Sequence, residues 1–283
     1  MKSATRKKCL LCGSRENKTI FSFTSPDKYE SSVGVDKKRY FRKWVRCKKC
    51  GFYYSVYSRP AKILERIYLT TYRDKTSAWR KESPEDTFKK IISLPKSKSE
   101  TYYRTEWIKK NISELEKDGV LQKSSNKEHA LDIGGGAGLF AFAFRDKNWK
   151  TYIIDPSKNN SFIKAKLKIP LAQKFYRPNL FPVKFDLISL IYVLEHVSDP
   201  INFLKAVRKD LKADALIYIE VPYSMAFSLK QKDDDIFNSC HLWMFDPKSL
   251  VKILDICGFE ALKLNRLKTL RGHYSLMLLA SKK

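Results

Sequence analysis

The sequence lacks long hydrophobic stretches. No apolar run reaches the ~18 residues that a membrane-spanning helix requires, and residues 1–8 are mostly polar and basic, without the apolar core of a secretory signal. Only six cysteines are present, which in a chain of this length favours reduced thiols or metal ligands over a disulfide framework. We therefore expect a cytoplasmic protein with no transmembrane segment.

Acidic residues are also scarce, because 30 Asp and Glu against 56 Lys and Arg give a formal net charge of +26. Such a charge favours polyanionic partners, for example nucleic acid or phosphorylated small molecules. The basic residues are scattered along the whole chain and form no arm or stripe, a pattern typical of a lysine-rich solvated surface. The 283 residues, 43% of them hydrophobic, suffice for an α/β domain and a smaller module.

Four of the six cysteines form two matched pairs. Each pair has the spacing CxxC and is followed by glycine, which allows the tight turn of a zinc knuckle. Strand-like segments lie at 20–23, 40–45 and 52–54. Four thiolates leave no open position on zinc, so the metal would serve folding rather than catalysis. The sequence predicts a zinc ribbon in residues 1–58, with Zn²⁺ held by Cys9, Cys12, Cys47 and Cys50.

Residues 59–127 form a bridging segment in this interpretation. Apolar residues recur at helical spacing over 61–72 and 102–117. Between these two stretches, prolines at 84 and 95 and a Ser/Lys-rich run break the pattern. We expect two helices joined by a mobile loop, capping the domain that follows.

Residues 128–283 alternate between strand-like and helical patterns. This alternation predicts an α/β fold with a doubly wound, mainly parallel sheet. The expected strands are 130–133, 150–155, a weak one within 169–174, 185–191, 215–221, 259–265 and 274–280.

The first of these strands leads into a glycine-rich turn. Gly134, Gly136 and Gly138 alternate between the strand and a helix, and glycine there lets a ligand lie directly against the backbone. Asp155 ends the second strand, where a carboxylate can accept hydrogen bonds from ribose hydroxyls. The pattern indicates a nucleoside-type cofactor.

Four segments of this region, 131–138, 153–157, 185–188 and 193–200, resemble the successive motifs of class I S-adenosylmethionine-dependent methyltransferases. The resemblance covers about residues 100–283 and implies a Rossmann-like sheet of seven strands with an antiparallel last strand. The four-cysteine module is similar to that of sugar-nucleotide C-methyltransferases and related glycan-pathway methyltransferases. Those enzymes carry an additional C-terminal domain, whereas this sequence stops shortly after the expected last strand.

The resemblance also implies a set of S-adenosylmethionine-binding residues. Asp132 and the three glycines would hold the methionine portion, Asp155 the ribose, and Pro156 would flank the adenine. Leu190 would border the sulfonium. The acidic residue expected beside the adenine has no clear counterpart, and the loop 175–180 offers only Asn179.

Methyl transfer is an in-line displacement, and the acceptor must lose a proton as it becomes nucleophilic. Glu195 and His196 follow the fourth expected strand, so His196 is a candidate general base with Glu195 as its partner or as the base itself. His241, which follows a polar loop, is a second candidate base. Tyr223, directly after the fifth strand, is expected to face the same pocket.

Three functions are compatible with this sequence. The leading hypothesis is C- or O-methylation of a phosphorylated sugar nucleotide or glycan intermediate in surface-polysaccharide or deoxysugar biosynthesis. The second is an RNA methyltransferase whose zinc ribbon and positive charge hold nucleic acid, although the base-methylation motifs Asn-Pro-Pro-Tyr and paired catalytic cysteines are absent. The third is a non-catalytic scaffold that binds zinc and cofactor.

Overall fold

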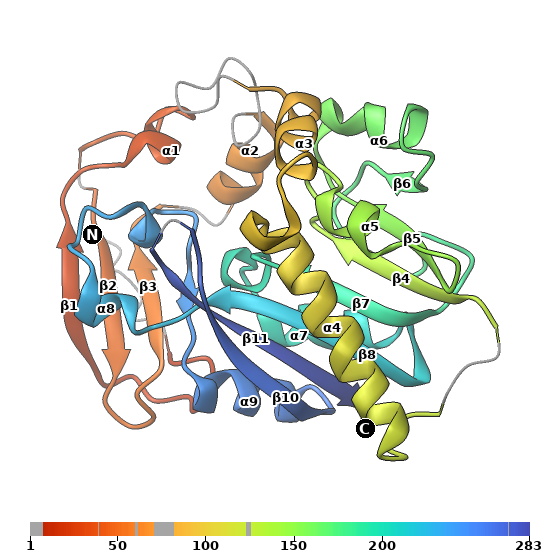
Figure 1. Ribbon diagram of the computed structural model, residues 1–283. Coiled ribbons are helices and arrows are strands. Elements are labelled where there is room, and N and C mark those ends of the chain that lie inside the picture. The colour runs from red at the N-terminus through yellow and green to blue at the C-terminus, as the bar shows by residue number, and fades with distance from the viewer. Residues whose placement is uncertain (1–7, 39, 60–61, 71–81, 123–125, 271) are drawn as a thin grey trace.

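The computed structural model describes residues 8–38, 40–59, 62–70, 82–122, 126–270 and 272–283. Two β-sheets make up the framework, one of four strands and one of seven. Figure 1 shows the N-terminal strands gathered at one side of the larger sheet and the long helix α4 (Glu100–Lys117) crossing one of its faces.

Among the described residues, no helix is both long enough and apolar enough to span a bilayer.

The seven-stranded sheet has the order β10-β11-β8-β7-β4-β5-β6. β4 to β8 run parallel to one another, while β11 lies antiparallel between β8 and β10. The expected doubly wound fold and its antiparallel last strand are therefore confirmed. The strands are β4 (Glu128–Ile133), β5 (Trp149–Ile154), β6 (Leu171–Ala172), β7 (Phe185–Ile191), β8 (Leu211–Pro222), β10 (Phe259–Lys268) and β11 (Tyr274–Lys282).

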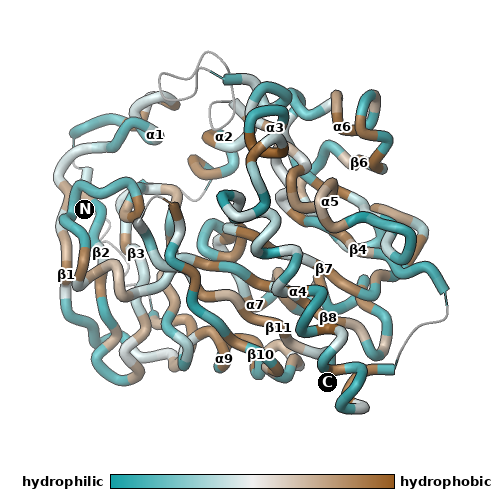
Figure 2. Tube along the Cα trace, viewed as in Figure 1, coloured by the Kyte–Doolittle hydropathy of each residue, from teal (hydrophilic) through white to brown (hydrophobic). Residues whose placement is uncertain are grey.

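Helices cover both faces of this sheet. On one face α4 and α5 (Leu139–Phe144) bury side chains such as Ile108 and Phe144, both fully inaccessible. On the other face α7 (Pro200–Arg208) and α9 (Pro247–Ile256) contribute Leu204 and Ile253 to a larger core. Each such side chain contributes roughly 1.5–3 kcal/mol. Figure 2 shows the strands as the most apolar part of the chain, as burial on both faces requires.

A smaller cluster covers the β5–β6 edge. It joins α3 (Pro84–Ile92), α5 and α6 (Ser161–Ala165) through side chains that include Phe88 and Ile163. Short elements complete the chain: α1 (Lys28–Ser31), α8 (Ala226–Leu229) and the 3₁₀ turns Lys96–Lys98, Lys158–Asn160, Leu194–His196 and Asp235–Phe237.

The N-terminal sheet contains a strand from the distant C-terminal half. β1 (Asn17–Phe23), β2 (Arg42–Cys47) and β3 (Tyr53–Tyr57) form an antiparallel meander, and β9 (Trp243–Met244) pairs with β3. Trp243 stacks on Phe52 with ring centroids 6.0 Å apart. Arg42 is buried and donates to the carbonyl oxygen of Phe237 at 2.6 Å. The cysteine-bearing module thus shares a sheet and a core with the α/β part.

The bridging segment contains one helix more than expected. The described part of the helix predicted at 61–72 is α2 (Lys62–Thr70), and the helix predicted at 102–117 is α4. The prediction of a loop around Ser83 was wrong, because α3 begins there. Ser83 Oγ accepts from the amide of Asp86 at 3.1 Å in a capping box, and Pro84 occupies the first helical turn, where proline needs no amide hydrogen. Residues 71–81 lie outside the described residues.

Candidate functional site

The glycine turn after β4 adopts a conformation that other residues avoid. Gly134, Gly136 and Gly138 have φ values of 74°, 57° and 76°. A Cβ built on Gly134 would lie 2.6 Å from Cγ2 of Val193, so the loop after β7 packs directly against this turn. The sequence therefore brings two carboxyl strand ends, those of β4 and β7, into contact.

Asp155, at the end of β5, fixes this turn from the other side. Its Oδ2 accepts from the amide of Gly136 at 2.9 Å. Its Oδ1 accepts from the amide of Ser157 and from Nδ2 of Asn160, both at 2.9 Å. A carboxylate has about four acceptor positions, so Asp155 has capacity left for a ligand hydroxyl while it orders the turn.

Asp132 lies beneath the turn and is 3% exposed. Its Oδ1 accepts from the hydroxyl of Ser189 on β7 at 2.7 Å. A Cβ on Gly135 would come within 2.8 Å of Oδ2 of Asp132, so this carboxylate supports the backbone of the turn. The two predicted acidic residues and the three glycines are thus brought together at one edge of the sheet.

The assignment of Asn179 to the adenine side was wrong. Its backbone amide donates to the carboxylate of Asp210 at 3.1 Å, and Asp210 directly precedes β8. Asn179 therefore lies at the amino ends of the parallel strands, opposite the glycine turn. Gln173 is the polar residue that follows β6, and its Nε2 donates to the carbonyl of Ser157 at 3.0 Å, close to Pro156. It has the position expected of an adenine neighbour, and counting from the strand end would have identified it.

The assignment of Leu190 to the sulfonium stays a prediction, and on β7 this residue pairs with Ile133, the last residue of β4. Its side chain is fully inaccessible and belongs to the core of the opposite face. β7 continues through Ile191, and Tyr192 follows with a φ of 54°.

Three of the four predicted catalytic side chains meet beside the glycine turn. Glu195 and His196 lie in the 3₁₀ turn after β7, and His241 comes from the segment before β9. Their ligand-type atoms all lie within 4.8 Å of one another, and the two imidazole centroids are 4.8 Å apart. The amide of Leu242 donates to the carbonyl of Glu195 at 2.8 Å and holds the two segments together. We refer to Glu195, His196 and His241 as the Glu-His-His cluster.

Burial determines the charge of this cluster. Desolvation raises the pKa of Glu195 well above its ordinary range, and the side chain is fully inaccessible. Desolvation likewise lowers the pKa of His241 to about 4. At neutral pH the imidazole of His241 is therefore neutral, while burial opposes ionisation of the Glu195 carboxyl group.

The described contacts of Tyr223, the fourth predicted residue, are with residues outside this cluster. Its ring lies beside the guanidinium of Arg266 at 5.4 Å, and its backbone pairs with Phe245 and Tyr274. Tyr68 of α2 is instead the aromatic neighbour of the cluster, with its ring 5.6 Å from that of His196 in an edge-on arrangement.

A buried ion pair that the sequence prediction missed lies near the carboxyl end of β8. Arg104 of α4 donates to both oxygens of Glu220, through Nε to Oε2 and through Nη2 to Oε1 at 2.9 Å. Tyr218 and Ser275 donate to the same carboxylate at 2.7 and 3.2 Å. Desolvation opposes ionisation of Glu220, but Arg104 and the hydroxyls of Tyr218 and Tyr192 outweigh it and lower the pKa of this carboxyl group. The sequence signal for this ion pair was a single charged residue, Glu220, within the otherwise apolar strand 215–221.

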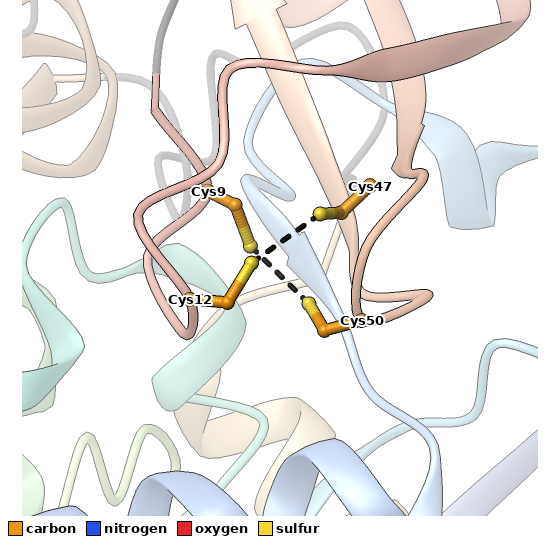
Figure 3. A group of neighbouring side chains, drawn as sticks. All are labelled: Cys9, Cys12, Cys47 and Cys50. Carbon is orange, nitrogen blue, oxygen red and sulfur yellow. Dashed lines mark hydrogen bonds between the residues drawn. The ribbon is translucent and has the colours of Figure 1, made fainter.

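The four cysteines converge from two loops, as Figure 3 shows. Cys9 and Cys50 have sulfurs 3.5 Å apart, as do Cys12 and Cys47, and all four lie within 4.8 Å of one another. Burial opposes ionisation of Cys47, but the amide of Cys50 and the thiol of Cys12 outweigh it and lower its pKa to about 7. Four converging thiols with one ready to ionise suit a tetrahedral metal ion.

Comparison with known proteins identifies the α/β part. Residues 101–264 match the family model described as methyltransferase domain. This match covers more than half of the chain, which therefore belongs to the methyltransferase-domain family.

Two curated relatives share part of this region. The tRNA U34 carboxymethyltransferase of Campylobacter lari is 31% identical over 131 residues, covering 42% of this chain and 43% of the relative. The ubiquinone biosynthesis O-methyltransferase of Pelagibacter ubique is 31% identical over 122 residues, covering 41% and 51%. The chain thus spans about half the length of the curated relatives it matches.

Among solved structures, the chain is similar to the 1,6-didemethyltoxoflavin-N1-methyltransferase of Burkholderia thailandensis, crystallised with S-adenosylhomocysteine. The TM-score is 0.49 and the identity 14%, over 70% of this chain and 84% of that one. An S-adenosylmethionine-dependent methyltransferase from Aquifex aeolicus gives a TM-score of 0.46 at 17% identity, over 71% and 100%.

Proposed function

We propose that this chain transfers the methyl group of S-adenosylmethionine to a hydroxyl oxygen of a small phosphorylated acceptor, with sugar nucleotides and glycan intermediates as the acceptor class. The observation that carries the proposal is the contact between the glycine turn and the loop that bears the Glu-His-His cluster, at Gly134 and Val193. This contact supports the proposal, because a cofactor held at the turn would lie beside side chains able to take a proton.

The residues around the turn suit S-adenosylmethionine. Asp155 would bind the ribose hydroxyls with its remaining acceptor capacity, and Pro156 and Gln173 would border the adenine. Asp132 and the glycine amides would hold the methionine portion. When bound, the cofactor supplies an electrophilic methyl group on a sulfonium, and the chain orients an acceptor in line with it.

The Glu-His-His cluster would activate the acceptor. Nδ1 of His196 lies 2.9 Å from the carbonyl oxygen of Cys240, so Nδ1 carries the proton and Nε2 holds the basic lone pair. An acceptor hydroxyl placed at Nε2 would lose its proton there as the oxygen takes the methyl group. S-adenosylhomocysteine and the methylated ether are the products. The cluster favours O-methylation, as does the activity named for the ubiquinone-pathway relative.

The four-cysteine group would hold a structural zinc ion. Its closed donor set leaves no position for a substrate, and the knuckles anchor β2 and β3 of the small sheet. Zinc analysis of the purified chain should find this ion, and chelation should unfold the module. A chain whose folding ignores the chelator would contradict this role.

Calorimetry with S-adenosylhomocysteine tests the cofactor site. Asp155→Asn replaces one acceptor oxygen with a donor, so binding should weaken by roughly 2–3 kcal/mol or more, as expected for a lost hydrogen bond to a charged group. Asp214→Asn, at an exposed position on β8, should bind as the unaltered chain does. Unchanged binding by Asp155→Asn would refute the assigned site.

Transfer of labelled methyl groups to an acceptor panel tests the substrate class. The panel should contain sugar nucleotides, phenolic quinone precursors and transfer RNA. Label on a sugar nucleotide hydroxyl is the expected result, and label confined to either other class would overturn that part of the proposal.

RNA is a second candidate acceptor, favoured by one specific surface. A shallow groove at the second cysteine knuckle is lined by Lys18, Arg46, Lys48 and Lys49. Four cations in one groove suit a phosphate backbone. If RNA is the substrate, the paired charge reversal Lys48→Glu/Lys49→Glu should weaken binding of transfer RNA and flatten its salt dependence. Binding that is independent of these lysines would exclude this groove as an RNA site.

A further inference from the structure

The carboxyl group of Glu195 is the most anomalous polar group of the site. It is fully inaccessible, and neither of its oxygens has a hydrogen-bond partner in the part of the chain that the structure describes. Nε2 of His196 lies 3.7 Å from Oε1 of Glu195, which is beyond hydrogen-bonding distance. Leaving such a group unpaired costs ~1–3 kcal/mol, so a missing partner is the natural explanation.

The two imidazoles are both oriented by backbone carbonyls. Nδ1 of His196 donates to Cys240 at 2.9 Å, and Nδ1 of His241 donates to Ile236 at 2.7 Å. In each ring the lone pair therefore lies on Nε2. This arrangement, one ring nitrogen donating to a carbonyl and the other carrying the lone pair, is how proteins orient histidines that ligate metals.

The surrounding segments fix all three donors. Glu195 and His196 share one 3₁₀ turn, and the segment of His241 is bound to it through Leu242 and to the N-terminal module through Ser239, whose amide donates to Asp27 at 2.6 Å. Such preorganisation is typical of a built site rather than of a chance cluster.

We propose that the Glu-His-His cluster binds a divalent metal ion of the zinc type through the carboxylate of Glu195 and Nε2 of His196 and His241. One carboxylate and two imidazoles suit zinc or iron(II) better than magnesium, which prefers oxygen ligands. One ligand-type atom from each of the three residues lies within 4.8 Å of the others, and Nε2 of His196 lies 3.7 Å from Oε1 of Glu195. Coordination at the ~2.0–2.2 Å bonds of zinc would draw the donors together by side-chain rotation. Three protein ligands leave a position open.

The open position gives the metal a part in the reaction. This inference rests on the proposed methyl transfer and deepens it, because His196 becomes a ligand rather than the proton acceptor. An acceptor hydroxyl bound to the ion would lose its proton more readily, as water does on zinc. The proton leaves to solvent, the oxygen takes the methyl group from the sulfonium, and no electron transfer is needed.

Metal titration of the full-length chain tests this site separately from the cysteines. Chelator-treated protein is reloaded with Co²⁺, whose thiolate charge-transfer band reports the cysteine group alone, and then with Zn²⁺. The unaltered chain should take up about two ions, one at the four-cysteine group and one at the Glu-His-His cluster. The second ion should produce no thiolate band, and Mg²⁺ should not displace it.

Variants locate the second ion. His241→Gln and Glu195→Gln should each lower the affinity for the second ion by more than the roughly 10–100-fold that is lost with a supporting hydrogen bond. Both variants should keep the thiolate band of the cysteine group. His129→Gln, a histidine at the start of β4, is the matched control and should take up both ions. An unaltered chain that binds metal at the cysteines alone would overturn the inference, as would a second ion that both cluster variants retain.

S-adenosylhomocysteine binding separates this inference from the proposed function. A chain that binds S-adenosylhomocysteine but no second ion remains a methyltransferase with His196 as base. A chain that binds the second ion but no S-adenosylhomocysteine keeps the metal site and loses the proposed reaction.

Discussion

Two fully buried glutamates, Glu195 and Glu220, lie near the carboxyl edge of the large sheet and differ in every other respect. Glu220 receives donors from Arg104, Tyr218 and Ser275, and its pKa is lowered. Glu195 has no hydrogen-bond partner within the described ranges, and its pKa is raised. Equal burial thus produces opposite ionisation. The paired carboxylate contributes to stability, while the unpaired one is costly and available for a ligand.

The largest expected effect comes from breaking the paired glutamate. Arg104→Met removes the cation but leaves Glu220 buried, so the free energy of unfolding should fall by roughly 3–5 kcal/mol in chemical denaturation. The double variant Arg104→Met/Glu220→Met, which removes both charges, should recover much of this loss. If the single variant is as stable as the unaltered chain, the ion pair does not hold α4 on the sheet.

Acid should act on the cluster through His241. Its pKa is lowered to about 4 in the folded chain, whereas the unfolded chain protonates near the ordinary value of 6.5. The unfolded state therefore binds the extra proton first, and stability falls as the pH drops from about 6.5 toward 4, by at most about 3 kcal/mol.

Urea unfolding at pH 7 and pH 4.5 measures this acid dependence. In His241→Gln the decrease between the two pH values should be smaller by that amount. An equal decrease in both chains would mean that His241 is not desolvated as described.

A rise in pH should affect the stability contribution of Glu195 in the opposite direction to that of Glu220. Because the folded pKa of Glu195 is raised, its contribution to stability declines as the pH rises above its unfolded pKa of 4.5. Glu195→Gln abolishes this decline, so the metal-free variant should be more stable than the unaltered metal-free chain by roughly 1–3 kcal/mol at pH 7.

Thermal unfolding with and without Zn²⁺ sharpens this test. With the ion bound, the carboxylate has its partner, and Glu195→Gln should become the less stable chain. Glu220→Gln is the control and should be destabilised under both conditions. If Zn²⁺ changes the thermal stability of both glutamine variants in the same way, Glu195 and Glu220 do not differ in their need for a bound partner.

Much of the fold follows from the sequence because its signals are local. Alternating patterns located all seven strands of the large sheet, and the glycine turn and Asp155 were identified from residue type and position. The wrong prediction in the bridging segment also arose from a local signal. Ser83 and Pro84 were interpreted as a break although they begin α3.

What could not be predicted depends on contacts between distant segments. His241 was named as a candidate, but its meeting with Glu195 depends on the bond from Leu242 to Glu195 and on the pairing of β9 with β3. Neither has a sequence signal, because each joins segments separated by many residues. The partner of Glu220 was missed for the same reason, since Arg104 lies 116 residues away.

The smallest expected effect tests whether the N-terminal module positions the cluster. Asp27 accepts from the amide and the hydroxyl of Ser239, at 2.6 and 2.8 Å, and so fixes the segment that carries His241. Asp27→Ala removes both bonds together with the side-chain cap of α1, in which Asp27 accepts from the amides of Tyr29 and Glu30. It should lower the free energy of unfolding by about 1–2 kcal/mol and weaken binding of the second metal ion. Asp235→Ala removes a pair with Lys28, in which both side chains are about half exposed, and the long hydrogen bonds of 3.4 and 3.5 Å from the hydroxyl of Tyr29. Such a pair contributes at most about 1 kcal/mol, and its removal should leave metal binding unchanged. If the two variants bind the second ion alike, the module does not set the position of His241, and the cluster is built by the methyltransferase part alone.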